Sequence, residues 1–317
     1  MVRAEDIHAA VTALRAGHVV GLPTETVYGL AGDASNPAAV ARIFAIKGRP
    51  ATHPVIVHVR DADAARTWTR TWTAAAAALA HRFWPGPLTL VLPKADHVLP
   101  QVTGGQDTVA LRVPAHPVAQ AVLQAFDGGL AAPSANRYGR VSPTTAAHVR
   151  ADLGEEVALV LDGGPCDVGL ESTIVDCTTD LPRVLRPGRI TAEEIASAAG
   201  GLGEVSGEVP RVPGSVVSHY APRTPVEIVE PGSLAGAIDA HRTRGEQVAV
   251  LAPGAGALSG VSAGIDADAD AHAFGRRLYA HLRALDATGA DVILVAQPPA
   301  GAAWQAVHDR LRRAAAR

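Results

Sequence analysis

Residues 108–113 could hold an anion. They read Thr-Val-Ala-Leu-Arg-Val, a composition typical of a β-strand. Because side chains alternate between the two faces of a strand, Thr108, Ala110 and Arg112 share one face and the apolar residues share the other. An arginine in that setting can grip a carboxylate or a phosphate through paired donors. The strand therefore predicts an anion site at Arg112.

A second candidate is the motif Lys47-Gly48-Arg49-Pro50, in which two cations flank a flexible glycine. Two cations so placed suit a polyphosphate, whose charge must be held and partly neutralised. The alternative is a basic helix end that the macrodipole stabilises. Taken alone, the motif favours neither interpretation.

Four other polar residues give weaker signals. His58 lies in the apolar run 55–59, where a lone histidine is more often a hydrogen-bonded structural residue. Ser134 and Asn136 can bond a nucleotide or phosphate, although both residue types are also common in turns. Ser142 precedes a proline and can equally be a helix N-cap, whose helix N-terminus is itself an anion site.

The apolar pattern predicts an α/β fold around these residues, with a mixed sheet and flanking helices. Helices are expected over residues 7–14, from Asn36-Pro37 to Gly48, after Ser142-Pro143 and from the capping box at Thr191 to Glu194. Strands are expected at residues 19–22, 55–59, 88–92, 108–113, 129–132, 157–161 and 173–176.

The organisation of the chain changes near residue 200. Residues 201–225 are rich in Gly, Pro, Ser and Val and have no helical or strand period, as expected of a linker. Beyond them, strands at 226–229, 248–251 and 291–295 alternate with helical stretches, which is typical of a small parallel α/β domain. The predicted division is a main domain at 1–200, a linker at 201–225 and a small domain at 226–317.

Composition excludes several classes of protein. The net charge of −3 argues against a surface built throughout to neutralise nucleic acid, although local basic patches remain compatible with it. The two cysteines and 13 histidines form no zinc-binding motif, and no GxxxxGK[ST], GxGxxG or GxSxG motif stands in a suitable setting. With no signal peptide and no apolar run long enough to span a bilayer, a soluble cytoplasmic protein is expected.

An ordered series of motifs extends along the chain: PTETVYGL, KGRP, a strand ending in VH, TVALRVP, PSAN, SPT, GGPC, EST and RPG. Over roughly residues 5–195 this series resembles the YrdC-like threonylcarbamoyl-adenylate synthase family, including its Lys-x-Arg and Ser-x-Asn pairs. The segment 219–222, His-Tyr-Ala-Pro, and the domain after it are similar to the long two-domain form. The resemblance implies a twisted open sheet with a concave cationic pocket, followed by a Rossmann-like layer.

Enzymes of this family combine L-threonine, bicarbonate and ATP into threonylcarbamoyl-AMP and pyrophosphate, an early step towards the t6A modification of transfer RNA. By resemblance, the expected threonine site comprises Thr26, His58, Arg112, the backbone of Ala132, and Ser172. By the same resemblance, the expected ATP site comprises Lys47, Arg49, His53, Thr108, Ser134, Asn136, Ser142, Arg186 and Tyr220. Magnesium is expected on the ATP phosphates, and the implied partner is a downstream transferase complex that acts on transfer RNA.

Four positions carry further qualifications. The family usually has Asn where this chain has His53, whose imidazole can donate or accept one hydrogen bond. Tyr220 is expected to reach the site from a linker that excludes water, but it can also pin that linker by burial. Glu25 and Tyr28 receive no role beyond shaping the loop that contains Thr26, and no general base is assigned.

Two rival functions remain. The first is a carbamoyl-adenylate-forming enzyme of metalloenzyme maturation, which normally also carries zinc-finger and acylphosphatase modules that this sequence does not contain. The second is a non-catalytic module that binds double-stranded RNA in a basic concavity. Net acidity disfavours RNA binding, as does the shortage of aromatic platforms.

Overall fold

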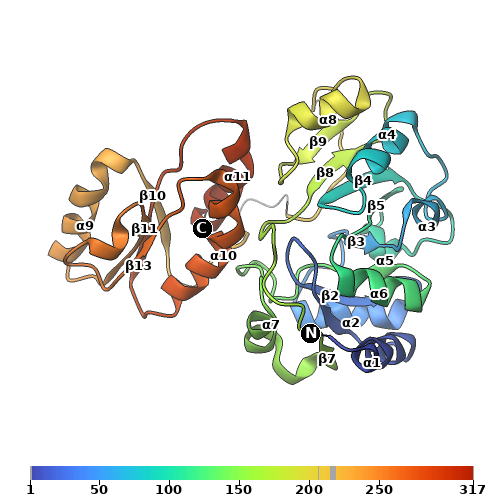
Figure 1. Cartoon of the computed structure of the whole chain (residues 1–317), viewed down its shortest axis with the longest axis horizontal. Helices are drawn as coiled ribbons and strands as arrows, with labels where there is room; N and C mark the ends of the chain where they lie inside the picture. Colours follow the sequence, from blue (N-terminus) through green and yellow to red (C-terminus); the bar gives the residue numbers. More distant parts are fainter. Residues whose placement is uncertain (1, 206, 215–218, 317) are drawn as a thin grey trace. The chain divides into compact units, whose positions relative to one another are not determined.

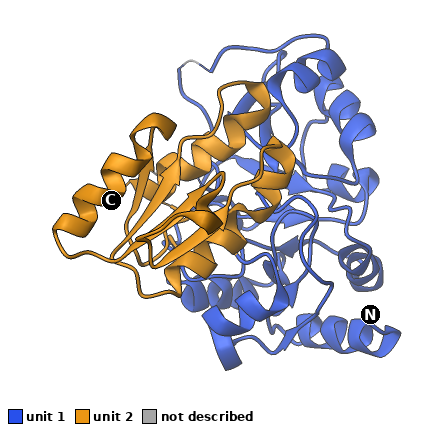
Figure 2. Cartoon of the chain, turned by 60° about the vertical axis from the view of Figure 1, so that its left-hand side comes forward, with its two compact units in different colours: residues 1–138, 143–215 blue, residues 139–142, 216–317 orange. Residues whose placement is uncertain are grey.

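The computed structural model describes residues 2–205, 207–214 and 219–316, and the chain divides into two compact units (Figures 1 and 2). Unit 1 comprises Met1–Tyr138 and Pro143–Ser215, and unit 2 comprises Gly139–Ser142 and Val216–Arg317. The linker predicted at 201–225 includes residues 206 and 215–218, which lie outside the described residues. Its described part contains no helix or named strand.

Unit 1 is built around a mixed sheet. Its elements are α1 (Ala4–Arg15), β1 (Val20–Leu22), β2 (Gly29–Asp33), α2 (Pro37–Lys47), β3 (Ile56–His58), α3 (Ala62–Arg66), α4 (Ala74–Phe83), β4 (Leu88–Pro93), α5 (Pro100–Thr103), β5 (Thr108–Arg112), α6 (Pro117–Phe126), β6 (Leu130–Ala131), α7 (Ala146–Leu153), η1 (Gly154–Glu156), β7 (Leu159–Val160), β8 (Thr173–Asp176), β9 (Arg183–Arg186) and α8 (Ala192–Ala199). Within the described residues the sheet has nine strands in the order β7-β1-β2-β6-β3-β5-β4-β8-β9.

The strands at the centre of this sheet have two different faces. On one face, alternate residues of β3 and β5, such as Val57 and Leu111, join a core that includes Ile43 of α2. On the other face, Ile56 and Ala110 belong to a small apolar cluster formed with β4 and β8. His58 and Arg112 follow these two residues on that second face, so the alternation predicted from the sequence is confirmed.

Helices cover the remaining parts of the sheet. Apolar residues of α1 and α6 pack together against β1 and β6, and the two helices lie side by side in Figure 1. Apolar residues of α4 and α8 pack against β4 and β8. The apolar stripes of these helices are buried against the sheet. The polar side chains lie instead at the carboxyl ends of β3 and β5, which pair in parallel.

The structure differs from the sequence prediction at the start of α7. Ser142 is not its N-cap, because the helix begins at Ala146 and the Thr145 hydroxyl accepts a hydrogen bond from the His148 amide. Threonine serves as well as serine at this position, and Thr145 lies directly before the first helical residue. By contrast, α2 begins after Asn36 and ends at Gly48 as predicted.

Unit 2 is a smaller α/β layer. Its elements are β10 (Val226–Val229), η2 (Pro231–Ser233), α9 (Leu234–Thr243), β11 (Val248–Ala252), η3 (Ala255–Ala257), β12 (Ala263–Asp266), α10 (Ala271–Asp286), β13 (Val292–Ala296), η4 (Ala302–Trp304) and α11 (Gln305–Ala315). The strands pair in parallel in the order β10-β13-β11-β12, which confirms the predicted parallel α/β type. Strand β12 was not predicted, because Ala-Gly-Ile-Asp lacks the usual β-branched run.

Candidate active site

Arg112 lies buried at the end of β5 and is held on three sides. Its Nη1 donates to Thr26 Oγ1 at 2.7 Å, its Nη2 to Glu25 Oε1 at 2.6 Å, and its Nε to the Gly86 carbonyl at 3.2 Å. A guanidinium has five N–H groups, so these bonds leave one on each terminal nitrogen without a partner in the described part of the chain. Two such N–H groups can bind a carboxylate.

His58 lies beside Arg112, because β3 pairs with β5 in a register that sets the two residues opposite each other. The imidazole is buried, and its Nδ1 has no hydrogen-bond partner among the described residues. Burial, assisted by the charge of Arg112, lowers the pKa of His58 to about 3, so the ring is neutral at pH 7. Leaving a buried polar atom unpaired costs on the order of 1–3 kcal/mol, so a ligand that bonds to it is favoured.

The state of His58 predicts how stability depends on pH. Its folded pKa lies below the ordinary value of 6.5, so its contribution to stability is complete above pH 6.5 and is lost as the pH falls towards 3. We expect the free energy of unfolding to fall by up to about 1.4 kcal/mol per pH unit in this window through this one residue. In denaturant unfolding at several pH values, the free energy of unfolding should depend less steeply on pH for His58→Asn than for wild type. The exposed His81→Asn is the matched control. Equal slopes for wild type and His58→Asn would contradict the assignment.

Side-chain hydrogen bonds hold the loop over residues 23–28. The Thr24 hydroxyl donates to the Val27 carbonyl at 2.6 Å and accepts from the Thr26 amide at 3.2 Å. The Tyr28 hydroxyl donates to the Gly164 carbonyl at 2.7 Å and accepts from the Gly163 amide at 3.1 Å. Tyr28 therefore ties this loop to the glycine-rich segment, a contact that the sequence did not indicate. The loop orients the Thr26 hydroxyl towards Arg112.

Ala132 and Ser172 complete the predicted threonine set. The Ala132 amide donates to the Ile56 carbonyl at 3.0 Å, which places it beside the strand of His58. Ser172 lies just before β8, and its hydroxyl is 2.7 Å from the Thr89 hydroxyl. Continuing the pairing of β4 with β5 by one residue sets Thr89 opposite Arg112. Thr89 was missed, although its alternation between two core leucines was a usable signal.

Lys47, at the end of α2, organises the Pro-Ser-Ala-Asn segment. Its Nζ donates to the carbonyls of Ser134 and Asn136, the second at 2.7 Å. Burial, and then the charge of Arg49, lowers the pKa of Lys47 well below its usual value. The structure therefore brings the predicted Lys-x-Arg and Ser-x-Asn motifs together at one place.

Arg49 and His53 meet around an aromatic ring that was not predicted. The Arg49 guanidinium lies 5.8 Å from the centre of the Tyr138 ring, and the Tyr138 hydroxyl is 2.9 Å from His53 Nδ1. The pKa of His53 is lowered, first by burial and then by Arg49 and Arg211. Nothing in the local sequence distinguishes Tyr138 from an ordinary turn aromatic.

The other predicted ATP residues lie in different places. Thr108 begins β5, so it shares a face with Arg112 at a distance of roughly 13 Å along the strand. Arg186 donates to the Ser172 carbonyl at 2.9 Å, which joins a predicted ATP residue to a predicted threonine residue. Ser142 and Tyr220 belong to unit 2.

Within unit 2, Tyr220 is buried and held by its neighbours. Its ring stacks on Tyr279 with centroids 5.7 Å apart, and the Arg310 guanidinium lies 5.2 Å from its centre. Its φ of 62° is left-handed, an uncommon conformation for a residue other than glycine. These contacts fix the position of Tyr220 in unit 2.

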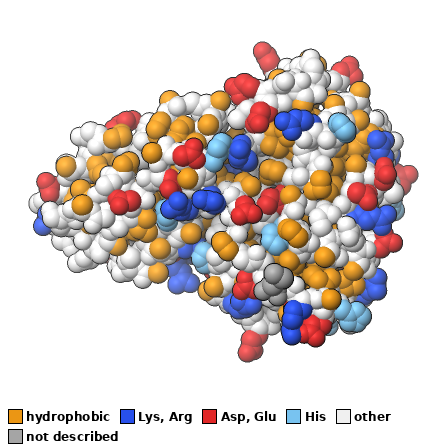
Figure 3. Space-filling view, in the orientation of Figure 1, with side chains coloured by type: hydrophobic (Ala, Val, Ile, Leu, Met, Phe, Trp, Pro, Cys, Tyr) orange, Lys and Arg blue, Asp and Glu red, His pale blue; other side chains and the backbone are white. Residues whose placement is uncertain are grey.

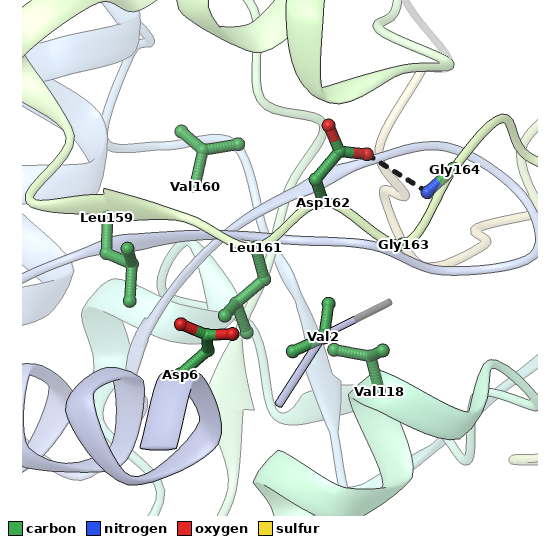
Figure 4. Close-up of a pocket in the computed structure, with 9 residues that line it drawn as sticks. All are labelled: Val2, Asp6, Val118, Leu159, Val160, Leu161, Asp162, Gly163 and Gly164. Atoms are coloured by element: carbon green, nitrogen blue, oxygen red, sulfur yellow. Dashed lines mark hydrogen bonds between the residues drawn. The ribbon is translucent and has the colours of Figure 1, made fainter. Parts of the chain in front are cut away.

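A pocket of about 680 Å³ on unit 1 is separate from these residues (Figure 4). It is lined by Val2, Asp6, Val118, Leu159, Val160, Leu161, Asp162, Gly163 and Gly164. The Asp162 carboxylate accepts from the Gly164 amide at 3.1 Å, as the dashed line marks. None of the residues predicted for threonine or ATP lines it, although Gly163 and Gly164 also bond the Tyr28 hydroxyl of the loop that contains Thr26.

The fold and the site together define a two-unit α/β protein. Its first unit holds a buried arginine, hydroxyls and a neutral imidazole at the ends of adjacent strands, together with a Lys-x-Arg helix end that contacts the Ser-x-Asn segment. The family described as "Telomere recombination" matches residues 12–188, and the threonylcarbamoyl-AMP synthase C-terminal domain matches residues 190–316.

Similar proteins span nearly the whole chain. The Bacillus subtilis threonylcarbamoyl-AMP synthase is 41% identical over 98% of this chain and 92% of its own length. The Pyrococcus abyssi protein of the same name is 39% identical over 97% of this chain and 93% of its own. The crystal structure of P. abyssi Sua5 complexed with L-threonine matches with a TM-score of 0.92 and 38% identity, covering 98% of this chain and 94% of that one. The chain belongs to the threonylcarbamoyl-AMP synthase family, in its long two-domain form.

Proposed function

We propose that this chain is an L-threonylcarbamoyladenylate synthase, which forms threonylcarbamoyl-AMP and pyrophosphate from L-threonine, bicarbonate and ATP. The observation that carries the proposal is the group at the end of β5. Arg112 offers two N–H groups without partners in the described chain, beside the unpaired Nδ1 of His58 and the oriented Thr26 hydroxyl. This arrangement suits a small molecule with one carboxylate and further polar groups.

The reaction is an adenylyl transfer. The threonine amine adds to carbon dioxide with loss of a proton, or condenses with bicarbonate with loss of water, to give a carbamate. A carbamate oxygen then attacks the α-phosphate in line. A new O–P bond forms as the bond to the leaving pyrophosphate breaks. We assign the threonine carboxylate to Arg112, and the triphosphate to the region of Lys47 and Arg49. Catalysis then rests on positioning and charge stabilisation, and no general base is assigned.

Magnesium is proposed to arrive with ATP. In the described residues, no group of three or more His, Cys, Asp or Glu side chains is placed to hold a metal ion. Mg²⁺ is commonly held by substrate phosphates, several waters and few carboxylates, which is compatible with this site. When bound, the ion would neutralise phosphate charge, while Lys47 and Arg49 orient the triphosphate.

The product is proposed to serve t6A formation in the cytoplasm, through a transferase complex that acts on transfer RNA. None of the helices in the described ranges is long and apolar enough to cross a membrane. Weak RNA binding remains a secondary proposal. On the face in Figure 3, acidic and basic side chains are interspersed, which does not favour a broad RNA surface there.

Pyrophosphate release tests the proposed function. Purified protein with ATP, Mg²⁺ and bicarbonate is expected to release pyrophosphate much faster with L-threonine than without it. D-Threonine is the matched control, because it has the same charge and composition but the opposite configuration. A rate that does not depend on L-threonine would refute the proposal, and salt-dependent RNA binding without this activity would favour the RNA-binding alternative.

A further inference from the structure

Glu25 forms an ion pair with Arg112, the arginine assigned to the substrate carboxylate. Its side chain is buried, and both of its oxygens are used. Oε1 accepts from Arg112 Nη2 at 2.6 Å, and Oε2 accepts from the Ala115 amide at 3.1 Å. Burying a carboxylate carries a desolvation cost, and Arg112 could attract anions without a paired carboxylate. The reaction described above gives Glu25 no task.

The charges at the end of β5 suggest a role for Glu25. Arg112 and Glu25 together carry no net charge, and the adjacent His58 is buried and unpaired at Nδ1. The active site must also receive a triphosphate, whose oxygens are good ligands for any available guanidinium. An unpaired Arg112 would therefore attract phosphate as well as the threonine carboxylate.

We propose that Glu25 is a specificity-determining residue, whose ion pair with Arg112 makes that arginine accept a singly charged carboxylate and reject phosphate. This inference rests on the proposed function. Both kinds of ligand are repelled by Glu25, but a dianion is repelled about twice as strongly as a monoanion. For charges about 5 Å apart at an effective dielectric constant of about 20, the difference corresponds to on the order of 100-fold in affinity.

Two substitutions separate charge from shape. Glu25→Gln removes the negative charge with little change in size, whereas Glu25→Asp keeps the charge and shortens the side chain. Calorimetry on the full chain at pH 8 measures the dissociation constants of L-threonine and of the inorganic phosphate that displaces it. In Glu25→Gln, we expect the ratio of the phosphate to the threonine dissociation constant to fall at least about tenfold. Wild type and Glu25→Asp should both resist displacement.

Other outcomes would overturn the proposal. If Glu25→Gln and Glu25→Asp weaken threonine binding alike and neither gains phosphate affinity, Glu25 only braces the loop. If phosphate readily displaces threonine from wild type, Glu25 provides no selectivity, and this measurement needs no variant to fold. Should wild type not bind threonine at all, the proposed function fails instead. In that case the role of Glu25 would still be supported if Glu25→Gln gains phosphate binding and Glu25→Gln/Arg112→Ala loses it again. If Glu25→Gln gains no phosphate binding, the role of Glu25 is refuted.

Discussion

Arg112→Ala is expected to raise the threonine concentration for half-maximal rate by on the order of 100-fold, because two charge-assisted hydrogen bonds to a carboxylate are lost. The ATP requirement should change by less than about threefold, since Thr26, Glu25 and Gly86 are the partners of this guanidinium and none belongs to the predicted ATP set. Steady-state pyrophosphate release with each substrate varied in turn measures both values.

Controls for this variant follow from the buried pair. Removing Arg112 leaves Glu25 as an unpaired buried charge, which costs on the order of 3–5 kcal/mol, so the thermal midpoint must be recorded as well. Arg112→Lys keeps the charge without the planar fork and should lie between wild type and Arg112→Ala. Exposed Arg82→Ala serves as the matched surface control. Equal effects of Arg112→Ala on the two substrates would refute the carboxylate assignment.

Arg49→Ala is expected to have the opposite effect: it should weaken ATP binding by roughly 10- to 100-fold and leave threonine binding nearly unchanged. Arg49 follows the end of α2, donates to the Pro54 carbonyl at 2.8 Å and lies over the Tyr138 ring. Equilibrium binding of a non-hydrolysable ATP analogue, with and without threonine, measures this effect directly.

The companion variant for Arg49 is Tyr138→Phe. It keeps the ring beside Arg49 and removes only the hydroxyl that bonds His53, so it should weaken ATP much less than Arg49→Ala does. If Arg49→Ala weakens threonine binding as strongly as ATP binding, the separation of the two subsites is wrong.

Local patterns explain what was predictable from the sequence. Period-two alternation correctly predicted the face of β5 that carries Arg112, and Asn36 with Gly48 correctly bounded α2. These features depend on residues close together in the chain, where geometry limits the choices. The family and the two-domain form were likewise predicted, because many motifs occur in a fixed order.

Contacts between distant residues were not predictable in the same way. Glu25 and Arg112 are separated by 87 residues, and nothing in either motif indicates that they pair. The place of Tyr138 beside Arg49 depends equally on how two distant turns meet. Ser142 was wrongly given as a possible N-cap because two threonines follow it and any of these residue types can cap a helix. Which residues approach one another is decided by tertiary packing.

Analysis of the reaction product tests the central proposal most directly. The full chain is incubated with ATP, Mg²⁺, L-threonine and ¹³C-labelled bicarbonate, and the adenylates are identified by mass spectrometry. We expect threonylcarbamoyl-AMP that contains threonine and carries the ¹³C label, formed in equal amount with pyrophosphate. An adenylate that lacks threonine or the label, such as carbamoyl-AMP, would contradict it, as would release of pyrophosphate with AMP alone.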